Sequence, residues 1–149
     1  RVISNFIVQA IQNKDITIYG NGEQTRSFCY VDNLIDALII LMETNDNDIT
    51  GPINIGNPAE YSIKDLANKI ITMTNSKSKL IFQELPQDDP MRRQPDITLA
   101  ESILKWSPSI QIDEGLKYTI EYFSKLKNDL ATDFKSERQR KYHKKDLEI

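Results

Sequence analysis

Short strand patterns between amphipathic helix patterns constrain the fold of this 149-residue chain more than any other feature. Apolar side chains recur at helical spacing over residues 2–13, 33–43, 63–71, 97–104 and 114–126. The strand patterns between them are brief, at residues 15–19, 26–31, 52–55 and 79–82. None is a long, continuously apolar strand of the kind found in a buried parallel sheet. We therefore expect an α/β fold, a mixed α+β segment without such a sheet.

Polar residues and glycines mark where these elements begin and end. Ser62, followed three residues later by Asp65, is typical of a capping box. The sequence predicts aspartate N-caps for three other helices, at Asp32, Asp96 and Asp113. Gly20-Asn21-Gly22 favours a hairpin-like turn. Three prolines in residues 84–95 indicate a loop.

Single copies of cysteine and histidine exclude several kinds of site. Cys29 has no partner for an intrachain disulfide. Together, Cys29 and His143 supply only two ligands of the Cys/His type, fewer than a zinc site needs. The apolar surroundings of Cys29 favour a small packed side chain, and His143 lies in a charged tail, where nothing would orient it. Asp88-Asp89 is better explained as a solvated loop than as a cation site. We expect no metal and no catalytic residue in this segment.

Charge and hydropathy limit the partners. A net charge of −3 argues against a nucleic-acid binder, and no apolar run approaches a membrane span, so a soluble segment is expected. Residues 133–149 hold six Lys or Arg against four Asp or Glu, unlike the acidic remainder. We expect one domain over residues 1–130 and a frayed or disordered tail over 131–149.

Three arginines stand on rigid local sequence. Arg26 follows the glycine turn, and Arg92 and Arg93 lie between prolines. A guanidinium on a fixed turn suits bidentate binding of phosphate or carboxylate, although surface ion pairs are the simpler interpretation. The Gly20-x-Gly22 turn is not a dinucleotide fingerprint, because position 25 is Thr.

Five blocks in unbroken order resemble the UDP-glucuronate decarboxylases, or UDP-xylose synthases. These belong to the extended short-chain dehydrogenase/reductases of the NAD-dependent epimerase/dehydratase family. The Arg-Val-Ile-Ser-Asn-Phe opening and the Asp-Asp-Pro-Met-Arg-Arg-Gln-Pro-Asp-Ile loop are the most discriminating blocks. The blocks are residues 1–7, 16–34, 51–63, 88–98 and 106–123.

The resemblance implies the C-terminal, nucleotide-sugar-binding portion of a Rossmann-type enzyme, without the dinucleotide-binding half. None of the six tyrosines is followed four residues later by Lys, so the family's Tyr-x-x-x-Lys is absent. In the family, bound NAD oxidises C4 of UDP-glucuronate, CO2 leaves the keto acid, and re-reduction gives UDP-xylose. The resemblance implies that the absent half binds most of the NAD, that the full enzyme is a homodimer and that this segment alone is inactive.

The resemblance also implies roles for individual residues. Arg26 corresponds to a diphosphate-binding arginine, with Phe28 beside it on the same strand face. Arg93 corresponds to an arginine close to the diphosphate and the sugar. Arg92 is a weaker candidate, because a surface charge explains it equally well. Asp96 reaches the ribose or holds the loop. The remaining positions are Thr17, Ile18 and Tyr19 at the uracil, Val2 and Asn5 at the pocket edge, and Arg1 near the cofactor.

Other side chains have structural explanations, and two other functions stay open. Trp106, Tyr122 and Phe123 are expected to be core anchors. The alternatives are part of a related nucleotide-sugar 4,6-dehydratase or 4-epimerase, or a free-standing interaction module without catalysis. The compartment would be the cytoplasm for a bacterial-like protein and the Golgi lumen for a eukaryotic one.

Overall fold

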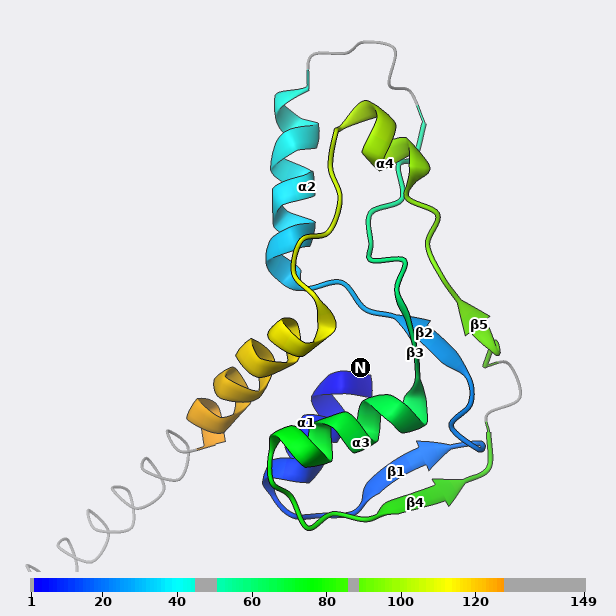
Figure 1. Ribbon diagram of the computed structural model, residues 1–149, viewed down its shortest axis with the longest axis vertical. Coiled ribbons are helices and arrows are strands. Elements are labelled where there is room, and N and C mark those ends of the chain that lie inside the picture. The colour runs from blue at the N-terminus through cyan, green and yellow to red at the C-terminus, as the bar shows by residue number, and fades with distance from the viewer. Residues whose placement is uncertain (1, 45–50, 86–88, 128–149) are drawn as a thin grey trace, which may run out of the picture.

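The computed structural model describes residues 2–44, 51–85 and 89–127 as a mixed α/β fold (Figure 1). Arg1, His143 and the predicted tail over residues 131–149 therefore lie outside the described residues. The elements are α1 (Val2–Ile11), β1 (Ile16–Tyr19), β2 (Thr25–Ser27), α2 (Val31–Glu43), β3 (Glu60–Ser62), α3 (Ile63–Met73), β4 (Leu80–Gln83), β5 (Arg92–Arg93), α4 (Thr98–Ile103) and a final helix over residues 112–127.

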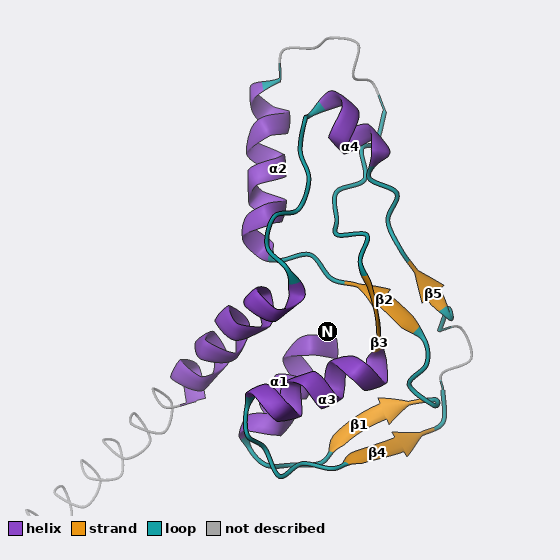
Figure 2. Cartoon of the chain, in the orientation of Figure 1, coloured by secondary structure: helices purple, strands orange, loops and turns teal. Residues whose placement is uncertain are grey.

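The strands form two small sheets (Figure 2). In the first, β1 pairs with β4 in parallel, from Ile16 opposite Leu80 to Tyr19 opposite Gln83. In the second, β2 lies between antiparallel β3 and parallel β5. The expected hairpin after β1 is wrong, because β1 and β2 belong to different sheets. The turn, with φ of +71° at Gly20 and +78° at Gly22, instead carries the chain from one sheet to the other.

The first hydrophobic core joins α1, β1, α3 and the final helix. Figure 1 shows α1 and α3 lying over β1 and β4. The predicted inward face of α3 is confirmed, and Ser62 caps this helix by accepting a hydrogen bond from the Asp65 backbone N–H at 3.0 Å. The fully buried large side chains come from all four of these elements: Ile7, Ile16, Ile18, Leu66, Ile70 and Leu116.

The second core lies between α2 and α4. Ala37 of α2 packs with Ala100 of α4 and with Trp106, which confirms Trp106 as a core anchor. Cys29 packs against the same cluster. The prediction for Tyr122 is wrong, because this ring is 64% exposed, while Phe123 packs partly against the first core.

The three predicted aspartate caps differ from the observed helix starts. Tyr30 is the N-cap of α2, so Asp32 lies in the first turn, where a negative charge still favours the helix dipole. Ile97 is the N-cap of α4, although the Asp96 carboxylate accepts hydrogen bonds just before it. Asp113 lies inside the final helix and forms an ion pair with Lys69 at 2.6 Å.

Three strand predictions also need correction. Residues 52–55 form no strand among the described residues, because no neighbouring strand pairs with them there, and Ile53 and Ile55 pack on the second core instead. The strand expected over residues 26–31 ends at Ser27. Conversely, the expected loop over 84–95 contains β5.

Candidate functional site

A cavity of about 750 Å³ opens beside the second sheet, where α1, β1, β2 and the start of α3 meet the final helix. Apolar side chains of α1 form part of its wall, and polar side chains of β1 and β2 form another part. The described lining residues are Val2, Ser4, Asn5, Phe6, Val8, Gln9, Thr17, Tyr19, Gln24, Arg26, Ile63, Asp89 and Phe123.

Strand β1 contributes Thr17 and Tyr19 to this cavity. Because side chains alternate along a strand, Ile18 points the other way and is fully buried in the first core. The Thr17 Oγ1 accepts a long hydrogen bond of 3.5 Å from Gln9 Nε2. Buried Gln24 donates from Nε2 to the Tyr19 carbonyl at 2.7 Å, and so holds the end of β1 against the turn that follows.

Arg26 is held by strands on both sides. Its backbone lies opposite Tyr61 of β3 and Arg93 of β5. The guanidinium donates from Nη1 to the Thr25 carbonyl at 2.7 Å, and Nη2 forms an ion pair with Asp89. Only 14% of the Arg26 side chain is exposed, so the cavity wall presents one oriented guanidinium.

The other two arginines lie on opposite faces of the second sheet. Arg92 points to the face of Thr25 and Glu60, where its Nε and Nη2 donate to the Glu60 carboxylate at 2.9 and 2.6 Å. These bonds, followed by that from Thr25, lower the pKa of Glu60, and the carboxylate raises the pKa of Arg92. Arg92 is therefore a structural ion pair, whereas the register places exposed Arg93 on the Arg26 face.

Asp96 has a structural reason for its place. Its carboxylate accepts hydrogen bonds from Thr98 Oγ1 at 2.6 Å and from the Thr98 backbone N–H at 2.9 Å. The same bonds lower the pKa of Asp96. These bonds hold Asp96 at the start of α4, and Asp96 is not among the described residues that line the cavity.

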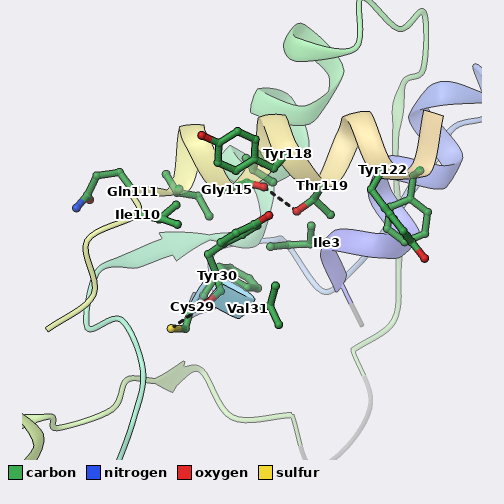
Figure 3. Close-up of a pocket in the computed structure, with 14 residues that line it drawn as sticks. Ile3, Cys29, Tyr30, Val31, Ile110, Gln111, Gly115, Tyr118, Thr119 and Tyr122 are labelled. Atoms are coloured by element: carbon green, nitrogen blue, oxygen red, sulfur yellow. Dashed lines mark hydrogen bonds between the residues drawn. The ribbon is translucent and has the colours of Figure 1, made fainter. Parts of the chain in front are cut away.

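A second cavity of about 470 Å³ has a different character (Figure 3). It lies between the final helix and the link from β2 to α2, and none of its described lining side chains is an Asp, Glu, Lys or Arg. The Tyr30 and Tyr118 rings are 5.6 Å apart at 53° within it. Phe28 lines this cavity and not the 750 Å³ one. Since β2 ends at Ser27, the expected strand face shared by Phe28 and Arg26 is not formed. Burial raises the pKa of the Cys29 thiol, which fits a packed side chain.

The structure thus brings together part of the predicted site. Five predicted residues line the 750 Å³ cavity: Val2, Asn5, Thr17, Tyr19 and Arg26. Four others, Ile18, Phe28, Arg93 and Asp96, lie outside its described lining, and Arg1 is not described. All these roles stay predictions.

Among the polar lining residues, sequence reasoning missed Gln9, Gln24, Asp89 and Ser4. The helical spacing of Gln9 from Asn5 could have indicated the first of these, since residues four apart share a helix face. Within the described ranges there is no group of three His, Cys, Asp or Glu placed to hold a metal ion, and no helix is long and apolar enough to cross a bilayer. The cavity thus has an apolar wall from α1 and a polar wall that holds the Arg26–Asp89 ion pair.

Residues 1–56 match the NAD dependent epimerase/dehydratase family. The chain is 46% identical over 125 residues to UDP-glucuronic acid decarboxylase 1 of Danio rerio, which covers 84% of this chain and 29% of the relative. It is also 46% identical over 123 residues to UDP-glucuronic acid decarboxylase 3 of Arabidopsis thaliana, covering 83% of this chain and 35% of the relative. The resemblance found in the sequence is confirmed.

Solved structures give the same result for the fold. UDP-glucuronic acid 4-epimerase from Bacillus cereus, in complex with UDP-glucuronic acid and NAD, matches with a TM-score of 0.80 and 29% identity, over 85% of this chain and 40% of that one. UDP-glucose 4-epimerase from Thermotoga maritima, with UDP-glucose, matches with a TM-score of 0.79 and 28% identity over the same shares. The chain therefore spans well under half the length of these proteins.

Proposed function

We propose that this chain binds the UDP part of a UDP-sugar in an enzyme like the UDP-glucuronate decarboxylases. The observation that carries the proposal is the oriented Arg26 guanidinium at the wall of a cavity that Thr17 and Tyr19 also line. A diphosphate presents oxygens to the fork of guanidinium N–H donors, and the strand end and helix α1 would border the nucleoside.

The whole protein, on this proposal, converts UDP-glucuronate to UDP-xylose and CO2. Its higher identity to decarboxylases, 46%, than to the solved 4-epimerases, 28–29%, favours decarboxylation over epimerisation. NAD would accept the hydride from C4 and later return it.

The described residues do not fit a dinucleotide cradle, because the Gly20 and Gly22 turn links two strands and not a strand to a helix. We therefore assign the redox chemistry to parts of the enzyme outside this chain, and propose that the chain alone is inactive.

Calorimetric titration with UDP tests the binding role. We expect Arg26→Ala to weaken UDP binding about tenfold or more, since hydrogen bonds to charged groups contribute about 1.5–3 kcal/mol. Arg26→Lys, which keeps the charge without the fork, should fall between. Lys69→Ala removes another ion-paired cation, outside the cavity lining, and should leave the affinity unchanged. Equal affinity of Arg26→Ala and the unchanged chain would contradict the proposal.

Arg93 needs the same titration, because its predicted role rests on the family resemblance and on its sheet face. Arg93→Ala should weaken UDP binding, whereas unchanged affinity would remove Arg93 from the proposed site. In the intact enzyme, released CO2 and UDP-xylose would support decarboxylation, and UDP-galacturonate as the product would support a 4-epimerase.

A further inference from the structure

The Arg26 guanidinium already has an anion beside it. Its Nη2 forms an ion pair with Asp89, a residue 63 positions away that lies between β4 and β5. Both side chains line the 750 Å³ cavity, and they are the two charged residues among its described lining. The proposed diphosphate and the Asp89 carboxylate would therefore require the same cation.

We propose that Asp89 is an internal competitor for the nucleotide diphosphate, which displaces its carboxylate from Arg26 on binding. The inference rests on the proposed function, because it concerns the same guanidinium. It makes Asp89 a residue that sets the affinity of the site, and it makes binding an exchange of one anion for another.

The geometry fits a stationary cation and a movable anion. Arg26 belongs to the central strand of the second sheet, and its Nη1 is bonded to the Thr25 carbonyl. Asp89 belongs to no described helix or strand, and 36% of its side chain is exposed, against 14% for Arg26. Two residues later, the Met91 carbonyl accepts a hydrogen bond from the Thr25 N–H at 2.9 Å. The carboxylate can thus turn toward solvent while β5 stays paired.

The exchange of the Asp89 carboxylate for the diphosphate at Arg26 determines how UDP binding should depend on salt. A diphosphate and a carboxylate repel each other at short range in a partly buried cavity. Without the ligand, Asp89 neutralises a guanidinium that would otherwise be mostly buried with no ionic partner among the described residues. With the ligand, one ion pair forms as another breaks, so that added salt weakens both and changes the affinity little.

Titrations with UDP at low and high KCl test the proposal. Asp89→Asn leaves Arg26 without its competitor, and we expect it to bind UDP about fivefold more tightly than the unchanged chain. Its affinity should also fall more steeply with salt, because binding now forms an ion pair without breaking one. Asp89→Glu keeps the charge and should resemble the unchanged chain. Asp113→Asn breaks an ion pair with Lys69 instead and should change neither quantity.

A double-mutant cycle separates competition from simple repulsion. In an Arg26→Ala background, Asp89→Asn should improve UDP binding less than it does when Arg26 is present. Circular dichroism checks the fold of each variant. The weak salt dependence of the unchanged chain is a measurement that needs no variant, and a steep dependence there would count against the exchange.

The outcomes distinguish this inference from the function on which it rests. If the unchanged chain does not bind UDP, or if Arg26→Ala binds it equally well, the proposed function fails and the inference fails with it. If Arg26→Ala loses affinity while Asp89→Asn binds equally or more weakly, the function stands. Either result disproves the competition, and weaker binding would indicate that Asp89 orients Arg26 for the ligand.

Discussion

Gly22 shows how a single residue controls the approach of two elements. Its φ of +78° lies in the left-handed region, and a Cβ placed there would be 2.9 Å from the Lys64 Cβ. Its carbonyl accepts a hydrogen bond from the Lys64 N–H at 3.0 Å, at the start of α3. Gly22 thereby lets the turn after β1 lie against α3, next to buried Gln24 of the cavity.

We expect Gly22→Ala to lower the free energy of unfolding by about 1–3 kcal/mol, because alanine at this φ is strained and its Cβ collides with α3. Urea unfolding followed by the fluorescence of buried Trp106 measures the loss. Gly51→Ala is the matched control, since a Cβ there meets nothing within 4 Å. Equal unfolding midpoints for the two variants would refute this account of Gly22.

At the scale of elements, β5 depends on side chains more than on its own length. It has two residues, both exposed, yet it is paired to β2. Glu60 joins all three strands of the sheet by accepting hydrogen bonds from Thr25 Oγ1 at 2.7 Å and from Arg92. Because Asp89 and Arg93 flank or belong to β5, this network also positions the charges beside the candidate site.

The lowered pKa of Glu60 predicts a pH-dependent contribution to stability. A carboxyl whose folded pKa is depressed stabilises the fold above its ordinary value of 4.5, and this contribution is lost as the pH falls through the folded pKa. Glu60→Gln should therefore unfold at lower urea than the unchanged chain near pH 7, with the difference shrinking at acid pH. Glu23→Gln, at an exposed position of the turn after β1, is the control. A difference independent of pH would exclude the ion pair as its cause.

Sequence patterns predicted the elements that local chemistry determines. The α1 and α3 helices, β1, β4 and the Ser62 cap depend on side-chain periodicity and on bonds between near neighbours. The pairing of strands that lie far apart in the sequence leaves no such local pattern. The partnership of Arg26 with Arg93 spans 67 positions, and residues 52–55 have strand composition but no neighbouring strand in the described structure.

The residues of the candidate site also fall into those that the sequence predicted and those that long-range contacts determine. Thr17, Tyr19 and Arg26 were predicted from the family blocks, and they do share a cavity. The sequence could not show that Asp89 pairs with Arg26, because a loop carboxylate has no periodicity and its partner lies 63 positions away. Likewise, burial of Gln24 follows from the turn between two sheets, which replaced the expected hairpin.

At the scale of the whole molecule, α2 has the most exposed apolar surface among the described helices. Its inner side packs Ala37 on the second core, but Leu38 and Met42 on the outside are 47% and 85% exposed. Val31 and Ile35 extend this surface along the helix. In α1, by contrast, Phe6, Ile7 and Ala10 are buried.

An apolar helix face of this kind favours association, because the removal of apolar surface from water lowers the free energy. We expect the isolated chain to self-associate as its concentration rises, measured by sedimentation velocity. Leu38→Glu places a charge in the middle of the surface and should shift the chain toward monomer. Because Leu38 is not among the described residues that line the 750 Å³ cavity, the same variant should keep the affinity for UDP that we propose. Leu99→Glu alters an exposed side chain of α4 and should leave association as it is. A monomer at every concentration, or equal association of both variants, would rule out α2 as the contact face.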